Sequence, residues 1–216
     1  MDKAKALQML LEGTRSLGVP LGKDVGESLL RFSDELARWN SKVNLTAIRD
    51  PGEVLEKHFV DSLAVFSEVK SAAKLLDIGS GGGFPGIPLK LAVPGLDVTL
   101  VESSSRKVAF LKHALVALGL QNGIRAVEAR AEGEPGREGI PLAEVVISRA
   151  LHAPEEWVKL AERYLSDEGR VIAMLGSKWS VPQLESIAKT YQGTVAIHSY
   201  RLPFSGARRA FAVFRF

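Results

Sequence analysis

The hydrophobic pattern of the chain changes near Ala73, and this change limits the folds that it can adopt. Before this point, apolar residues recur at helical spacing and predict amphipathic helices over residues 2–17, 24–40 and 50–69. After it, apolar runs alternate with amphipathic segments, which predicts strands over residues 75–78, 97–101, 124–128, 144–147 and 170–175 and helices over residues 85–92, 105–118 and 154–165. Strands and helices that alternate with short connections predict an α/β fold with a parallel sheet.

The last two predicted strands differ from those before them. They cover residues 194–200 and 209–216, and only a short segment with Pro203 and Gly206 connects them. This link forces an antiparallel pair, because parallel neighbours need a crossover of roughly a dozen residues or more. We therefore expect an N-terminal helical appendage over residues 1–72 and an α/β domain over residues 73–216 that ends in an antiparallel hairpin.

Composition excludes several classes of protein. The 216 residues include no cysteine, which excludes a disulfide framework and a thiolate zinc cluster and suits a reducing compartment. No apolar run reaches the roughly 20 residues that span a bilayer, and no signal-type segment follows Met1, so we expect a cytoplasmic protein. Residues 1–72 hold 10 basic and 11 acidic residues, whereas residues 73–216 hold 18 and 14. A basic C-terminal part is compatible with a polyanionic partner such as RNA.

A glycine-rich loop, Gly-Ser-Gly-Gly-Gly over residues 79–83, lies between the first predicted strand and the next helix. Glycine permits positive φ angles and a close approach of the backbone to a ligand, and the following helix N-terminus offers unpaired N–H groups. Glu102 lies at the end of the next strand, where a carboxylate can accept two hydrogen bonds from a ribose diol. This arrangement predicts a cradle for a nucleotide-type cofactor, held by Gly79, Gly81, Gly83 and Glu102.

Two cofactors compete for this loop. The segment from Gly81 to Gly86 formally satisfies the G-x-G-x-x-G motif of dinucleotide-binding enzymes. That motif needs its first glycine at the strand end, which is Gly79 here, and Phe84 then occupies the position of the third glycine. The order Asp77-Ile78-Gly79-x-Gly81-x-Gly83 instead resembles motif I of S-adenosylmethionine-dependent methyltransferases. The predicted sheet with its final hairpin is typical of their class I, Rossmann-like fold, and we expect Phe84 to lie beside the ligand.

The segment from Asp77 to Leu89, DIGSGGGFPGIPL, resembles the signature of the ribosomal RNA small-subunit methyltransferase G family, once called glucose-inhibited division protein B. Further segments match the family in order along nearly the whole chain: Trp39-Asn40, Asn44-Leu45-Thr46, His58 with Asp61-Ser62-Leu63, Glu102-Ser103, Arg106-Lys107, Phe110-Leu111 and Ile147-Ser148-Arg149-Ala150. The resemblance implies methyl transfer from S-adenosyl-L-methionine to N-7 of a guanine (guanine-527) in bacterial 16S ribosomal RNA. We expect the enzyme to act as a monomer and to bind no metal.

The resemblance also implies roles for particular residues. It places the following residues along the cofactor or the active site: Gly79 and Phe84 through their backbones, Ala131, Glu132 and Arg149. One position departs from the family pattern, because Leu175 stands where relatives commonly carry lysine. Lys178, close behind it, is the candidate substitute.

The residue chemistry suits that reaction. Guanine N-7 carries an in-plane lone pair and no proton, so its attack on a sulfonium methyl needs positioning and no general base. Methylation of pyrimidine carbon-5 usually needs a cysteine, which the chain lacks. Methylation of exocyclic amines is associated with an Asp/Asn-Pro-Pro-aromatic motif after the fourth strand, where this chain has Ser148-Arg149-Ala150-Leu151. Arg149 suits three ligands there, namely guanine O-6, a phosphate or the cofactor carboxylate.

Other polar residues receive weaker assignments. His58 and Asp61 lie one helical turn apart, and two ligands do not make a metal site. They suit helix packing or hydrogen bonds between the two parts of the chain better than a catalytic role. Asn40 and Asn44 suit turn caps or the border of an acceptor pocket. Six basic residues are expected to form an electropositive rim for RNA: Arg106, Lys107, Lys178, Arg201, Arg208 and Arg209.

Three other functions remain open at this point. A small-molecule methyltransferase would enclose an apolar pocket with its N-terminal helices, and transfer of label to metabolites rather than RNA would identify it. A dinucleotide-dependent oxidoreductase would bind a reduced nicotinamide. A non-catalytic RNA-binding module that keeps a cofactor for structure would bind RNA and leave no methyl mark.

Overall fold

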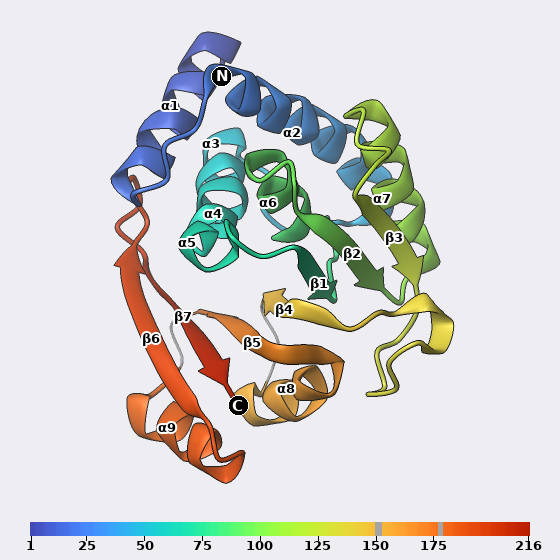
Figure 1. Cartoon of the computed structure of the whole chain (residues 1–216). Helices are drawn as coiled ribbons and strands as arrows, with labels where there is room; N and C mark the ends of the chain where they lie inside the picture. Colours follow the sequence, from blue (N-terminus) through green and yellow to red (C-terminus); the bar gives the residue numbers. More distant parts are fainter. Residues whose placement is uncertain (150–152, 177–178) are drawn as a thin grey trace.

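The computed structural model describes residues 1–149, 153–176 and 179–216 (Figure 1). The described strands form one seven-stranded sheet in the order β3-β2-β1-β4-β5-β7-β6. Strands β1 to β5 are parallel, and β7 runs antiparallel to β5 and β6, so the predicted parallel sheet with a final hairpin is confirmed. The strands are β1 (Lys74–Ile78), β2 (Asp97–Glu102), β3 (Ile124–Glu128), β4 (Ala143–Arg149), β5 (Leu165–Leu175), β6 (Thr194–Arg201) and β7 (Arg208–Arg215).

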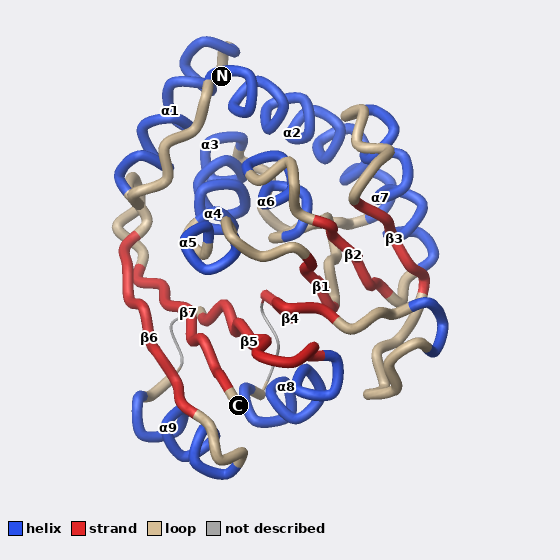
Figure 2. The backbone as a smooth tube through the Cα atoms, in the orientation of Figure 1, coloured by secondary structure: helices blue, strands red, loops and turns tan. Residues whose placement is uncertain are grey.

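Helices cover both faces of the sheet (Figure 2). One face carries α8 (Pro154–Ala161) and α9 (Val181–Thr190). The other face carries α1 (Lys3–Ser16), α2 (Lys23–Val43), α3 (Pro51–Val54), the π-helix η1 (Leu55–Val60), α4 (Asp61–Leu63), α5 (Phe66–Val69), α6 (Gly86–Ala92) and α7 (Ser105–Ala117). Helix α2 contacts α6 and α7, so the N-terminal helices form an outer layer on this face. Within the described ranges, no helix combines the length and apolar character needed to cross a membrane.

The helical stretch that begins after Asp50 is less regular than the sequence predicts. Asp50 caps α3, where its carboxylate accepts a hydrogen bond from the Glu53 N–H at 2.9 Å, and Pro51 occupies the first turn, as expected. The predicted single helix through residue 69 is wrong, because the chain widens into the π-turn η1 and breaks again before α5. Glu56 and His58 lie in this π-turn with buried side chains that make hydrogen bonds outside the helix.

The C-terminal third contains two further departures from the sequence prediction. Helix α9 was not predicted, although Ser180 and a proline in its first turn give the same start signal as Asp50 and Pro51 and its apolar residues form a short helical stripe. Ser180 caps this helix by accepting a hydrogen bond from the Gln183 N–H at 3.4 Å. Strand β5 begins at Leu165, where the sequence predicts the end of a helix, since α8 stops at Ala161 and the 3-10 turn η3 (Glu162–Tyr164) follows it.

Two hydrophobic layers flank the sheet. On one face, Leu10, Phe32 and Phe59 of the N-terminal helices lie in the same cluster as sheet residues such as Leu100 and Val145. On the other face, α8, η3 and α9 contribute a second cluster that includes Trp157, Tyr164 and Leu184. The helices of residues 1–72 therefore stabilise the sheet directly, because their apolar side chains and those of the sheet leave water together.

Candidate active site

The glycine loop leaves the carboxyl end of β1 and adopts conformations that favour glycine. Gly79, Gly81 and Gly83 have φ angles of 77°, 55° and 88°. A Cβ atom on Gly83 would lie 2.6 Å from Ile87 Cδ1, so the loop turns tightly against α6. The loop predicted from the sequence is therefore present, and its third glycine is required by both backbone angle and space.

The first two glycines of this motif are much less crowded. A Cβ atom on Gly79 would have the Ser148 Oγ as its nearest neighbour at 4.0 Å, and one on Gly81 would lie 3.9 Å from the Gly79 carbonyl oxygen. Each would meet the described residues at one ordinary contact distance and without overlap. The backbone is thus open where a ligand of nucleotide type needs to approach it closely.

Two buried polar atoms beside the loop have no hydrogen-bond partner among the described residues. They are Asp77 Oδ1 and Ser148 Oγ, at the carboxyl ends of the neighbouring strands β1 and β4. The other carboxylate oxygen, Asp77 Oδ2, accepts a hydrogen bond from the Gly86 N–H at 2.9 Å. Burial raises the pKa of Asp77 to about 7. A buried polar atom without a partner costs free energy, so both atoms fit a site that is completed by a polar ligand.

Glu102 ends β2 and braces the glycine loop. One carboxylate oxygen accepts a hydrogen bond from the Gly81 N–H at 3.0 Å, and the other accepts one from the Ser104 N–H at 2.9 Å. The side chain is only 7% exposed. Each carboxylate oxygen has a second lone pair, so Glu102 retains the capacity to accept hydrogen bonds from a ribose. The structure thus places Glu102 against the loop, as the sequence predicts, and adds a bracing contact that the sequence did not reveal.

Ala131 and Glu132 lie in the loop after β3, which pairs with β2 so that Glu128 is opposite Glu102. Ala131 is half-buried, whereas the Glu132 side chain is exposed, with a carboxylate oxygen 3.9 Å from the Arg137 guanidinium. The buried hydroxyl of Tyr164 accepts hydrogen bonds from three successive N–H groups of this loop, those of Glu132 (3.1 Å), Gly133 (2.8 Å) and Glu134 (3.2 Å). Tyr164 therefore fixes the backbone of the loop, a role that the sequence analysis missed.

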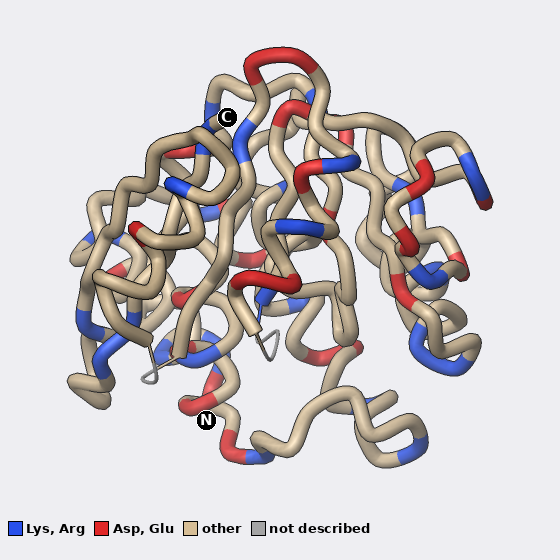
Figure 3. Tube along the Cα trace, turned by 90° about the horizontal axis from the view of Figure 1, so that it is seen from below, with Lys and Arg blue, Asp and Glu red and all other residues tan. Residues whose placement is uncertain are grey.

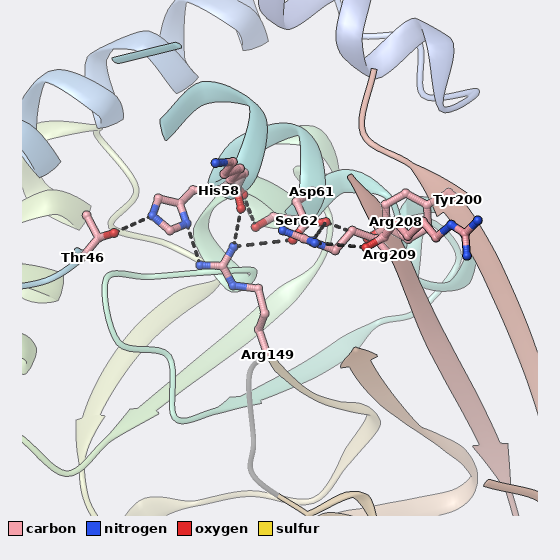
Figure 4. A network of polar contacts seen from close by, with 9 residues as sticks. Thr46, His58, Asp61, Ser62, Arg149, Tyr200, Arg208 and Arg209 are labelled. Atoms are coloured by element: carbon pink, nitrogen blue, oxygen red, sulfur yellow. Dashed lines mark hydrogen bonds and ion pairs between the residues drawn. The ribbon is translucent and has the colours of Figure 1, made fainter. Parts of the chain in front are cut away.

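Arg149 is the last residue of β4, and its side chain reaches the N-terminal helices (Figure 4). Its guanidinium donates hydrogen bonds to the Lys57 carbonyl oxygen at 3.0 Å and to His58 Nδ1 at 2.9 Å. It also lies 5.2 Å from the centre of the Phe84 ring, a cation–π contact. Phe84 is buried and contacts the rings of Phe32, Phe59 and His58, so its ring joins the loop to the helices.

Further polar contacts extend from Arg149 in two directions. Toward α2, His58 Nε2 lies 2.7 Å from Thr46 Oγ1, and the Asn40 side chain hydrogen-bonds both backbone groups of Thr46. Asn40 therefore caps this turn, which is one of the two roles predicted for it. Toward the hairpin, Asp61 Oδ2 lies 3.9 Å from the Arg149 guanidinium. These contacts confirm that His58 and Asp61 join the N-terminal helices to the rest of the chain.

The hairpin completes this cluster. Tyr200 donates a hydrogen bond to Asp61 Oδ1 at 2.8 Å, and the Arg209 Nε lies 3.7 Å from the same oxygen. Burial raises the pKa of Asp61, although Tyr200, Arg149 and Arg209 act in the opposite direction. One buried carboxylate thus faces two guanidinium groups.

His58 is neutral in this environment. Burial and the Arg149 charge lower the pKa of its imidazole to about 3. A neutral imidazole has one donor and one acceptor nitrogen. Since Arg149 donates to Nδ1, the proton is on Nε2, which donates to the Thr46 hydroxyl.

The expected electropositive rim is only partly assembled. Arg201 and Arg208 are exposed at the hairpin, whereas Arg209 is half-buried in the cluster with Asp61. Arg106 and Lys107 belong to the first turn of α7, across the sheet from the hairpin, and Lys178 lies outside the described residues. Leu175, the departure from the family pattern, ends β5 and pairs with Ala210. Lys and Arg alternate with Asp and Glu along much of the trace (Figure 3), so a basic surface must be sought locally.

Comparison with known proteins identifies relatives of this chain. The family model described as rRNA small subunit methyltransferase G matches residues 26–208. The chain is 54% identical to the Ribosomal RNA small subunit methyltransferase G of Myxococcus xanthus (strain DK1622) over 99% of each chain, and 44% identical to that of Anaeromyxobacter dehalogenans (strain 2CP-1 / ATCC BAA-258) over 95% of each chain. A solved structure of a putative RNA methyltransferase from Pyrococcus horikoshii shares the fold, with a TM-score of 0.53 and 18% identity over 85% of this chain and 96% of that chain. These matches show that the chain belongs to the rRNA small subunit methyltransferase G family.

Proposed function

We propose that this chain transfers the methyl group of S-adenosylmethionine to N-7 of a guanine in small-subunit ribosomal RNA. Membership of the family supplies the class of reaction, methylation of ribosomal RNA. The observation that carries the proposal is the edge of the sheet where β1 and β4 end. There, an uncrowded glycine loop lies beside two buried polar atoms, Asp77 Oδ1 and Ser148 Oγ, that have no hydrogen-bond partner among the described residues.

The residues at this edge suit the cofactor. When bound, S-adenosylmethionine supplies a methyl group made electrophilic by the sulfonium. The open backbone at Gly79 and Gly81 gives it room, and Glu102 offers free lone pairs to its ribose. Asp77 Oδ1 accepts hydrogen bonds and suits its ammonium group. We assign the remaining contacts to Gly83, Phe84, Ala131 and Glu132.

The acceptor needs orientation more than acid–base catalysis. Because guanine N-7 has no proton to lose, the protein must hold its lone pair in line with the methyl group. The base gains positive charge as the methyl group arrives, so a guanidinium beside the base would oppose the reaction. Arg149 therefore suits a phosphate of the acceptor strand better than guanine O-6. The hydrogen bonds that the described residues make with Arg149 use only two of its five N–H donors.

A matched pair of glycine variants tests the cofactor site. Gly81→Leu fills the space in front of the loop, whereas Gly119→Leu puts the same side chain on a comparable positive φ angle (69° against 55°) where nothing lies within 4 Å. We expect Gly81→Leu to weaken calorimetric binding of S-adenosylmethionine by at least about tenfold, and Gly119→Leu to leave it unchanged. Equal affinities in the two variants would refute the proposed cradle.

The reaction itself is tested on ribosomal RNA. A strain that lacks its own enzyme should regain N-7-methylguanine in 16S ribosomal RNA when it expresses the wild-type chain and not when it expresses Gly81→Leu. Borohydride reduction and aniline cleavage, followed by primer extension, locate the methylated guanine. Methyl transfer to metabolites without any ribosomal RNA mark would instead show a small-molecule methyltransferase.

Arg149→Gln tests the assignment of the phosphate. We expect a higher KM for RNA and a salt dependence of binding that is shallower by about one unit on a log–log plot, which is the change for one lost phosphate contact. Affinity for S-adenosylmethionine should stay within about twofold of wild type. A selective loss of cofactor affinity would show that Arg149 holds the cofactor carboxylate instead.

The same proposal includes a cytoplasmic location and a monomeric state. Ribosomal RNA is found in the cytoplasm of bacteria, which supports the location. Light scattering after gel filtration at several concentrations tests the oligomeric state, and a mass above that of one chain would refute it.

A further inference from the structure

We propose that His58 is a positioning residue that holds the guanidinium of Arg149 in place for its ligand. The inference rests on the proposed function, because it assigns His58 a role through Arg149 at the same site. His58 itself comes from the π-helix η1, and Arg149 ends β4, 91 residues later (Figure 4).

The first support is the geometry of the guanidinium. Its two hydrogen bonds go to acceptors that are both neutral, the Lys57 carbonyl oxygen and His58 Nδ1, and these are neighbours in η1. Two contacts at different nitrogens of a planar group fix its orientation as well as its position. Asp61 lies 3.9 Å away, which is too far for a hydrogen bond, so it offsets the charge without setting the direction.

The second support is that His58 is itself held on three sides. Its ring is stacked on the Phe84 ring with centres 5.0 Å apart and planes 23° apart. Its Nε2 lies 2.7 Å from the Thr46 hydroxyl oxygen, and that hydroxyl also accepts a hydrogen bond from the Ile48 N–H at 3.0 Å. Turning the ring over would place carbon atoms where both nitrogens now bind. The imidazole therefore has one orientation and one tautomer in which both contacts form.

The third support is the absence of any other task for this imidazole. It is buried, and its neutral form is favoured by burial and by the adjacent guanidinium. Both nitrogens are engaged by Arg149 and Thr46, so neither is available to take a proton from a substrate. Its contribution to the reaction is to present an acceptor to Arg149 from a rigid support.

Two substitutions separate the contacts of the two nitrogens. The Oδ1 of asparagine occupies the place of His Nδ1, so His58→Asn retains an acceptor for Arg149 and loses the contact with Thr46. The Nε2 of glutamine occupies the place of His Nε2, so His58→Gln retains the contact with Thr46 and loses the acceptor for Arg149. Positioning by His58 therefore predicts that glutamine is the more harmful change.

We expect His58→Gln to raise the KM for RNA about tenfold, in the same direction as the rise expected for Arg149→Gln, with cofactor affinity within about twofold of wild type. His58→Asn should stay within about threefold of wild type in KM. The ¹⁵N signals of the Arg149 guanidinium provide a second measurement that needs no RNA. They should show hindered rotation in wild type and in His58→Asn, and rotational averaging in His58→Gln.

Several results would overturn the inference. These are equal losses in the two His58 variants, wild-type activity in His58→Gln, or unchanged Arg149 signals in that variant. Should a His58 variant fail to fold, Thr46→Val is the alternative. It removes the hydroxyl that accepts from His58 Nε2 and from the Ile48 N–H, leaves both Arg149 contacts in place, and should shift the Arg149 signals in the same direction to a smaller extent. The NMR measurement also distinguishes the two proposals. If His58→Gln loses the hindered rotation of Arg149 while the wild-type chain produces no N-7 methylation, only the proposed function is refuted.

Discussion

Replacing Asp77 with asparagine should change how the stability of the protein depends on pH. Burial raises the pKa of this carboxyl from 3.8 to about 7. In the unfolded chain the same group titrates near its ordinary value. Between these two pH values, the folded protein keeps a proton that the unfolded chain has released. The free energy of unfolding therefore falls as the pH rises through this window, and Asp77→Asn removes that fall because an amide does not titrate.

The size of the effect follows from the width of the window. One pH unit inside it changes the free energy of unfolding by about 1.4 kcal/mol. A window from 3.8 to about 7 corresponds to a total of about 4 kcal/mol. In acid the protonated carboxyl has its O–H on Oδ1, because Oδ2 accepts from the Gly86 N–H, and asparagine places an N–H donor at the same position. The variant should thus begin close to wild type in acid and gain on it as the pH rises.

Urea unfolding followed by circular dichroism, at half-unit steps from about pH 4.5 to pH 8, measures this difference. Asp97→Asn, at the exposed start of β2, is the matched control, and its difference from wild type should be small throughout. A difference between wild type and Asp77→Asn that stays constant over the whole range would refute the reasoning, since a carboxyl that titrates alike in both states cannot produce a slope.

Three further predictions concern single residues. Gly83→Ala places an alanine at a φ angle of 88°, with its Cβ atom 2.6 Å from Ile87 Cδ1. It should therefore lower the free energy of unfolding by about 2–4 kcal/mol in urea titrations. A change below about 1 kcal/mol would contradict the geometry of the loop. Tyr164→Phe leaves three N–H groups without their acceptor, and calorimetry should show cofactor binding weakened by about tenfold; unchanged affinity would mean that this loop does not contact the cofactor. His58 should remain neutral with its proton on Nε2 from about pH 5 to pH 8 in ¹⁵N NMR, because its pKa is lowered to about 3. The stability that the neutral imidazole contributes is therefore lost only as the pH falls below about 6.5 toward 3. A titration of His58 near pH 6.5 would contradict its burial.

The parts of the fold that depend on local pattern could be predicted from the sequence. Strand β1, the glycine loop and Glu102 at the end of β2 follow from a buried apolar run, a cluster of glycines and the spacing of one βαβ unit. The hairpin of β6 and β7 follows from its short connection. Helix α9 carries similar local signals, a Ser180 cap and a proline in its first turn, and the sequence analysis missed it.

The contacts that organise the site depend on distant parts of the chain. No local pattern indicates that the Tyr164 hydroxyl meets the backbone of residues 132–134, or that His58 meets Arg149. Asp77 was visible in the motif, yet its buried oxygen without a partner appears only when β4 lies beside β1. Sequence reasoning therefore identified the glycine loop and Arg149 as candidates, and it missed the residues that hold them.

The hairpin connection also has a consequence for synthesis of the protein. The buried carboxylate of Glu56 accepts hydrogen bonds from the Phe204 and Ser205 N–H groups at 2.7 and 2.8 Å, and Asp61 depends in the same way on Tyr200. These two acidic groups thus depend on partners that a ribosome makes 139 to 149 residues later. A nascent chain that lacks these partners would have to bury uncompensated charge, which is costly. Maturation of the active site is therefore tied to synthesis of the hairpin connection, and a product that stops before Tyr200 should be a substrate for proteases rather than a partly active enzyme.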